Sequence, residues 1–175
     1  MDKNRAIGET IARSAITEVL ARYAHAVDRC DADLLDSVYW PEATDDHGLF
    51  SGKALEFGRF IIPLLKQETR SMHFISNILV VFDTEVRARV QCYFMAFHER
   101  DGRDGAVQYR VGGRYLDVFD CRHDEWRIAG RVVLMDWNES GPSTSTWDES
   151  ANFSSLKRGR RHPDDASRAW LAATR

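Results

Sequence analysis

RSMHFISNILVVF, residues 70–82, decides the fold, because its side chains follow the two-residue period of a β-strand while both of its faces are largely apolar. A strand of this kind is covered on both sides, so we expect helices on one face of its sheet and a further layer, such as another subunit, on the other. By this alternation His73 and Asn77 point to the same side as Ile75 and Leu79. That face is either part of a filled core or the wall of a cavity.

Helical and strand-like patterns are segregated along the chain. Apolar residues at three- and four-residue steps predict a long amphipathic helix over 7–27. Two shorter helices follow, one capped by Asp31 or Asp33 and ending near Tyr39, and one over 53–66 that contains Pro63. Period-two runs separated by turn-rich segments then predict a meander of four strands, over 71–82, 86–99, 107–120 and 126–136. This order indicates the α+β class: a cone-shaped barrel whose curved, mixed but mainly antiparallel sheet encloses a pocket covered by the N-terminal helices.

Composition bounds the class of protein. A chain of 175 residues that is 43% hydrophobic suits one main domain with a sizeable core. The formal charge of −3 disfavours a nucleic-acid partner, and no apolar run approaches the roughly 20 residues that cross a bilayer, so we expect a cytoplasmic protein without a membrane partner. Cys30, Cys92 and Cys121 are widely spaced and predict reduced thiols in or near the core.

The composition changes near residue 140. We expect residues 1–140 to form the α+β domain and residues 141–175 to form a C-terminal arm or lid, because this polar segment still holds Trp147, Phe153 and Trp170. The sequence leaves open whether the arm covers its own pocket or that of a neighbour.

Three segments carry a family resemblance: YAHAVDRCDADLLDSVYWPEATDD at residues 23–46, HFISN at 73–77 and GGRYLDVFDCRHDEWRIAGRVVLMDW at 112–137. Together they resemble the SnoaL-like branch of the nuclear-transport-factor-2-like superfamily over most of residues 10–140. Within that branch they are most similar to the group of scytalone dehydratase, hexachlorocyclohexane dehydrochlorinase and bile acid 7α-dehydratase. The resemblance implies a cone-shaped fold, no cofactor, and a homo-oligomer, with a trimer favoured over a dimer.

The same resemblance assigns a catalytic pair. Asp28 matches the family's dyad aspartate, and His73 matches its histidine. A histidine with an ordinary pKa of about 6.5 can remove a proton near neutral pH, while a buried carboxylate fixes its tautomer. Asp28 continues the four-residue steps of Leu20 and Ala24, so it can face inward. The plainer alternative is a helix-terminating Asp28 and a core His73.

Two further residues are candidates for catalysis. Tyr23, five residues before Asp28, matches the tyrosine of the bile acid dehydratase pattern, although it also belongs to the apolar helix stripe. Arg131 lies where related enzymes carry a functional basic residue, and it could pair with Asp28, with an anionic ligand group or with Asp136.

Residues expected to line the pocket are mostly apolar or aromatic. They are Asn77, Trp40, Phe57, Phe60, Ile61, Leu64 and Tyr115. We expect no metal, since adjacent strand residues such as Asp45, Asp46 and His47 point to opposite faces.

The expected function is a cofactor-independent lyase, of the dehydratase or dehydrohalogenase type, acting on a small hydrophobic cyclic substrate by His/Asp general-base elimination. The alternatives are a ketosteroid-isomerase-like isomerase, an epoxide hydrolase, and a non-catalytic ligand-binding or assembly subunit of the same fold. A filled pocket, or one without a bond from His73 to Asp28, would favour the last alternative.

Overall fold

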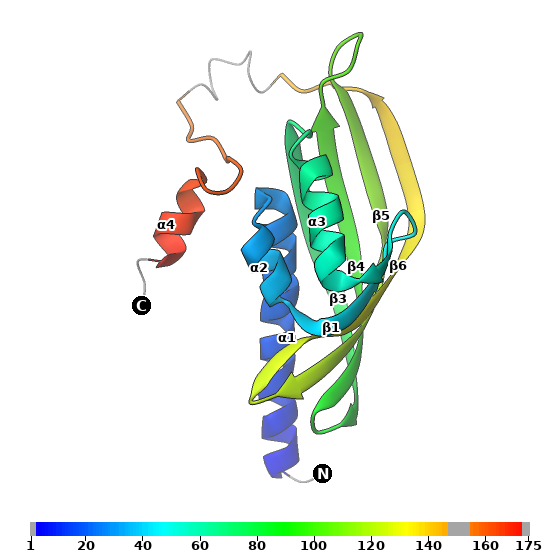
Figure 1. The fold of residues 1–175 in the computed structure, drawn as a ribbon, viewed down its shortest axis with the longest axis vertical. Coiled ribbons are helices and arrows are strands. Elements are labelled where there is room, and N and C mark those ends of the chain that lie inside the picture. Colours follow the sequence, from blue (N-terminus) through cyan, green and yellow to red (C-terminus); the bar gives the residue numbers. More distant parts are fainter. Residues whose placement is uncertain (1–2, 147–154, 173–175) are drawn as a thin grey trace.

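The structure, a computed structural model, describes residues 3–146 and 155–172 and places helices against one side of a single curved sheet (Figure 1). The expected helices are present as α1 (Lys3–Arg29), α2 (Ala32–Ser37), α3 (Ala54–Leu65) and α4 (Ala166–Ala172). Asp31 caps α2, because its carboxylate accepts a hydrogen bond from the backbone N–H of Leu34 at 3.1 Å.

The sheet has six strands rather than the four expected. They are β1 (Tyr39–Asp46), β2 (Ser51–Lys53), β3 (Arg70–Thr84), β4 (Arg87–Arg100), β5 (Val107–Arg122) and β6 (Glu125–Pro142). Their order is β2-β1-β6-β5-β4-β3, and β1 runs parallel to β6 while all other neighbours are antiparallel. The sheet is therefore mixed and mainly antiparallel as expected, but it remains open, with β2 and β3 as its edges.

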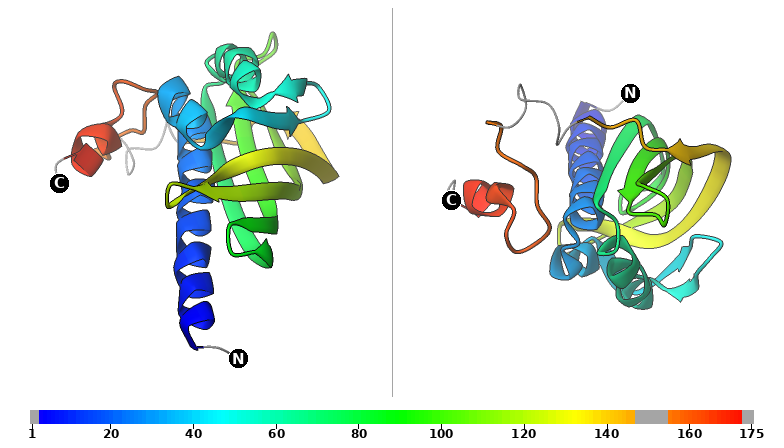
Figure 2. Two further views of the ribbon diagram at one scale, coloured as in Figure 1. Left: turned by 60° about the horizontal axis from the view of Figure 1, so that its bottom comes forward. Right: turned by 90° about the horizontal axis from the view of Figure 1, so that it is seen from above.

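The helices pack on the inner face of this curved sheet. α1 contacts β3 and β6, and α3 contacts β1 (Figure 2). α4 lies on the side of α1 that faces away from the sheet (Figures 1 and 2). Among the described residues, no helix is both long and apolar enough to cross a membrane.

Irregular registers bend the long strands. The pairing of β5 with β6 shifts between Gly112 and Gly113, and a Cβ on Gly113 would lie 2.0 Å from the backbone oxygen of Leu134. Only glycine allows this close approach, so the strands can curve around the space beneath the helices.

A second irregularity overturns part of the expected face assignment in β3. The register with β4 shifts between Ser76 and Leu79, and Asn77 has a positive φ of 50°. The extra residue of the bulge reverses the alternation, so His73 stays on the inner face while Asn77, Leu79 and Val81 are exposed on the outer one. The prediction that Asn77 shares a face with His73 is therefore wrong.

The outer face of the sheet is nevertheless apolar, as the two-sided pattern of β3 indicates. Its exposed members on β3 and β4 are Met72, Phe74, Leu79, Val81, Tyr93 and Met95.

Candidate active site

A cavity of about 430 Å³ lies between α1, α3 and the inner face of β3 to β6. This volume is within the range of roughly 300–1,000 Å³ that is typical of small-molecule sites. Four of the expected wall residues line it, namely Phe57, Ile61, Leu64 and Tyr115.

Two other expected wall residues lie elsewhere. Trp40 is in β1, where its indole N–H donates to the backbone oxygen of Asp120 at 3.0 Å and its ring lies under two guanidinium groups, of Arg122 and Arg127. Phe60 is 38% exposed on the outer side of α3 and stacks on Phe50. These predictions are wrong because β1 was not foreseen and because Phe60 lies outside the arc of α3 that faces the cavity.

The expected hydrogen bond between the histidine and the aspartate is present. Nδ1 of His73 lies 2.8 Å from Oδ1 of Asp28, and the backbone N–H of His73 donates to Oδ2 at 2.9 Å. Both oxygens of Asp28 are thus committed to one residue, which fixes the imidazole with Nδ1 toward the carboxylate and leaves Nε2 for the cavity that His73 lines. Burial acts to raise the pKa of Asp28, but the hydrogen bonds and charge of His73 outweigh it and hold that pKa below its ordinary value.

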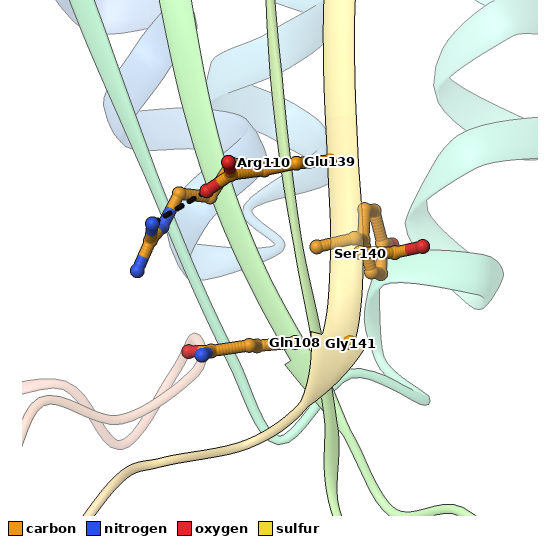
Figure 3. A pocket seen from close by; sticks show the side chains of 6 residues that line it. Gln108, Arg110, Glu139, Ser140 and Gly141 are labelled. Carbon is orange, nitrogen blue, oxygen red and sulfur yellow. Dashed lines mark hydrogen bonds and ion pairs between the residues drawn. The ribbon is translucent and has the colours of Figure 1, made fainter.

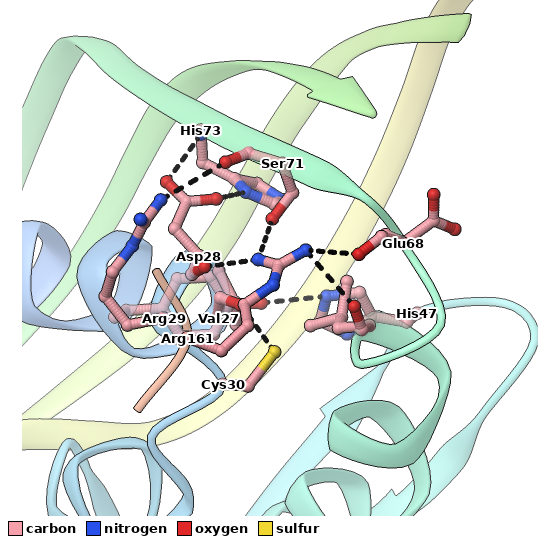
Figure 4. A network of polar contacts seen from close by, with 11 residues as sticks. Val27, Asp28, Arg29, Cys30, His47, Glu68, Ser71, His73 and Arg161 are labelled. Atoms are coloured by element: carbon pink, nitrogen blue, oxygen red, sulfur yellow. Dashed lines mark hydrogen bonds and ion pairs between the residues drawn. The ribbon is translucent and has the colours of Figure 1, made fainter. Parts of the chain in front are cut away.

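The C-terminal arm supports this pair from behind (Figure 4). The guanidinium of Arg161 donates to the backbone oxygens of Asp28, Leu65 and Glu68 and to the hydroxyl of Ser71. This contact joins the end of α1, the end of α3 and the start of β3, so it fixes the segments that carry the two partners of the dyad.

The described part of the arm therefore docks on its own chain. His162 pairs with Asp31, and Asp165 pairs with Arg29. No arm residue in the described ranges lines the cavity, while Trp147 and Phe153, which prompted the expectation of a lid, lie outside those ranges.

His98 is a site residue that was not predicted, because no motif in the sequence marks it. It lies on β4, its ring meets that of His73 edge-on at 5.3 Å, and it stacks on Tyr109 at 4.6 Å. Burial, reinforced by the charge of His73, lowers the pKa of His98 to about 4, so the ring is neutral at neutral pH. Its Nδ1 is buried without a hydrogen-bond partner among the described residues, and His98 lines the cavity, so its ring offers an uncommitted nitrogen.

Tyr23 also lines the cavity, but its hydroxyl is not isolated. It lies 3.2 Å from Nε2 of His47, a residue that follows β1 and lines the same cavity. Nδ1 of His47 in turn bonds Oδ1 of the fully buried Asp45. Burial raises the pKa of Tyr23, so this phenol stays protonated.

Asp45, Asp46 and His47 do not turn toward one common point. The carboxylate of Asp46 turns away to accept the backbone N–H of Gly48 at 3.0 Å. Within the described ranges, no three His, Cys, Asp or Glu side chains are grouped as metal ligands.

Arg131 takes none of the three roles expected for it. Its guanidinium makes two bonds of 2.7 Å to the carboxylate of Asp117, and neither side chain is exposed. It lies between the rings of Tyr23 and Tyr115, 4.1 and 4.0 Å from their centres. The neighbouring strand β5 supplies its carboxylate, so Arg131 supports these rings and is not among the residues that line the cavity.

Two other hollows lack such a constellation, and a third, of about 150 Å³ between α1 and the arm, holds the pair of His162 and Asp31 but is much smaller than the cavity of the dyad. One of about 190 Å³ between β5 and β6 is lined mainly by Gln108, Ser140, Gly141 and the ion pair of Arg110 with Glu139 (Figure 3). A larger one of about 680 Å³, between the start of α1 and the turn after β3, holds no histidine. The cavity with the dyad is therefore the candidate active site.

Comparison with known proteins identifies the family and the fold. The model of the SnoaL-like domain matches residues 8–132. No protein of curated function matches the chain in sequence.

Solved structures share the fold at low identity. A protein named as a scytalone dehydratase from Novosphingobium aromaticivorans is 15% identical with a TM-score of 0.70, covering 77% of this chain and 90% of that one. Hexachlorocyclohexane dehydrochlorinase LinA-type3 from Novosphingobium barchaimii is 14% identical with a TM-score of 0.68, covering 77% and 93%. A protein named as the beta subunit of an aromatic-ring-hydroxylating dioxygenase from N. aromaticivorans is 17% identical with a TM-score of 0.60, covering 74% and 92%. The family model spans most of the chain, and the chain belongs to the SnoaL-like domain family.

Proposed function

We propose that this protein is a cofactor-independent lyase that eliminates a leaving group from a small cyclic substrate by general-base catalysis. The observation that carries the proposal is the hydrogen-bonded pair of His73 and Asp28 at the wall of an open cavity. A filled interior or a separated pair would have favoured a scaffold role. Here the cavity is open and His73 is bonded to Asp28, which supports a role as a base.

His73 acts as the base. Its Nε2 removes a proton from carbon, and the electron pair forms the new double bond as the leaving group departs from the adjacent carbon. Asp28 holds the ring in the tautomer with Nδ1–H and stabilises the imidazolium that forms. The neutral His98 and the phenol of Tyr23 supply hydrogen bonds to polar groups of the substrate.

The walls favour an apolar ring system with few polar groups. Aliphatic side chains from α3 and the stacked rings of Phe94 and Tyr115, 4.4 Å apart, form flat and branched surfaces. An isomerase or epoxide hydrolase of the ketosteroid-isomerase kind would need a second carboxylate aimed at the substrate. Glu68 is the one carboxylate among the lining residues; its Oε1 accepts the hydroxyl of Tyr109 at 2.6 Å, while its Oε2 is buried without a partner among the described residues.

A panel of cyclic β-hydroxy ketones with one to three fused rings tests the proposal, because elimination yields an enone that absorbs in the ultraviolet. We expect turnover of at least one member, and a loss of about 100- to 10,000-fold in His73→Ala. The variant should remain folded, with a lower melting temperature because Asp28 loses the bond from the ring. Full activity in His73→Ala would contradict the assignment of the base.

A further inference from the structure

A second histidine–aspartate pair lines the same cavity as the first. His47 and His73 are carried by segments that are far apart in the sheet, since β6, β5 and β4 lie between β1 and β3. The curvature of the sheet nevertheless places both rings on one cavity. Each ring has its Nδ1 bonded to a buried aspartate, Asp45 for His47 and Asp28 for His73.

We propose that Asp45, His47 and Tyr23 form the acid half of the reaction, delivering a proton to an oxygen leaving group, so that the substrate is an alcohol rather than a halide. This inference rests on the proposed lyase function and specifies its substrate class. It identifies Tyr23 and His47 as catalytic residues and Asp45 as a positioning residue.

The hydrogen bonds form one chain that ends at the cavity. Tyr39 donates to Oδ2 of Asp45 at 2.6 Å, so the carboxylate is fixed on both of its oxygens. Since Nδ1 of His47 is held by Asp45, the remaining nitrogen, Nε2, is the one that exchanges a proton with the hydroxyl of Tyr23 at 3.2 Å.

The surroundings hold this chain in place. The ring of His47 stacks on Phe57 at 4.1 Å with an interplanar angle of 15°, which fixes its plane. Asp45 is the strand partner of Arg131, whose guanidinium bonds Asp117, so a buried cation lies beside both carboxylates. His47 is 19% exposed, whereas the side chain of Asp45 is fully buried, so the imidazole is the part of this pair that solvent can reach.

The base and the acid face the same space. Tyr23 and His73 both line the cavity, so a substrate held there can contact both side chains.

The proton balance is complete within the site. The C–H bond breaks and its proton goes to Nε2 of His73, while the electron pair forms the C=C bond. The C–O bond breaks, and the departing oxygen takes the phenol proton of Tyr23 and leaves as water. The phenolate regains a proton from solvent through Nε2 of His47, and His73 releases the proton taken from carbon to solvent.

Two probe substrates with the same ring and different leaving groups test this proposal. They are a decalone-sized β-hydroxy ketone and its β-chloro counterpart, which give the same enone. Chloride departs without a proton, so we expect His47→Gln and His47→Phe to slow the hydroxy probe by about 100-fold or more and the chloro probe by less than about threefold. His73→Ala should slow both probes.

A matched control is available in the adjacent carboxylate. Asp46→Asn removes a charge next to Asp45 but leaves the hydrogen bonds among Asp45, His47 and Tyr23 in place. It should not alter the ratio of the two rates, whereas Asp45→Asn should. Equal slowing of both probes in the His47 variants, or slowing of neither, overturns the acid role. Undiminished rates in His73→Ala would instead overturn the lyase proposal.

If the parent protein turns over neither probe, nitrogen NMR of the histidine rings decides the matter. We expect His47 to carry a proton on Nδ1, and its Nε2 resonance to move in Tyr23→Phe while that of His73 stays unchanged. A bare Nδ1 in His47, or no response to Tyr23→Phe, overturns the proposal.

Discussion

The ion pair of Arg131 and Asp117 offers a quantitative test of how the floor of the site is held. Neither side chain is exposed, and two bonds of 2.7 Å join them. Removing one partner of such a pair costs about 3–5 kcal/mol because it leaves a charge buried without its counterion. In Asp117→Leu the guanidinium would still lie near Asp45, the strand partner of Arg131, so we expect the lower end, about 3 kcal/mol.

Urea unfolding measures this loss. With a slope of about 2 kcal/mol per molar urea, 3 kcal/mol lowers the midpoint by about 1.5 M. The double variant Asp117→Leu/Arg131→Met removes both charges of the pair but leaves the buried Asp45 without the guanidinium, so it should regain part of the stability rather than all of it. A loss below about 1 kcal/mol in Asp117→Leu, or a double variant as unstable as the sum of the two single variants, would refute this reasoning.

Three other perturbations address the dyad, the arm and the outer face. The pKa of Asp28 in the folded protein is below its unfolded value of about 3.9, so the stabilisation by its ionised form is present above about pH 4 and is lost as the pH falls through the folded pKa. The free energy of unfolding of Asp28→Asn in urea should therefore differ from that of the parent protein at pH 6, and the two should converge toward pH 3. Arg161→Gln should destabilise the protein by about 1.5–3 kcal/mol in thermal unfolding and also lower turnover, since one guanidinium joins three backbone oxygens behind His73, and unchanged values of both would contradict this. We propose that copies of the chain cover the apolar outer face, so Phe74→Arg should reduce a trimer or dimer to monomers in light scattering, and a monomeric parent protein would exclude this.

The sequence predicts the class of fold and the central pair for clear reasons. The periodicities of α1 and of the long strands are strong, and the bond from His73 to Asp28 follows from the family resemblance and from the inward step of Asp28 on its helix. The long strand β3 was found, but the positive φ of Asn77 has no signature in a run of apolar residues, so the reversal of faces behind it could not be foreseen.

The pair of Asp45 and His47 was not predicted, because the strand that ends beside it, β1, was not predicted. The segment YWPEATDD, β1, contains Pro41 and lies between helices, and it is a strand because β6 pairs with it in parallel. Without knowledge of that strand, the sequence does not indicate that the side chains of Asp45 and His47 lie together. Arg131 likewise could not be paired with Asp117, because their proximity depends on the shifted register of β5 with β6.

The most direct test of the central assignment needs no leaving group. In D2O, a base at Nε2 of His73 should exchange the protons next to the carbonyl of 2-decalone, a ketone of suitable size for the cavity, and proton NMR follows their loss. We predict that the parent protein accelerates this exchange over buffer and that His73→Ala, shown to be folded by circular dichroism, does not. Equal acceleration by both proteins, or none by a parent protein shown to bind the ketone, would contradict the role of His73 as the base.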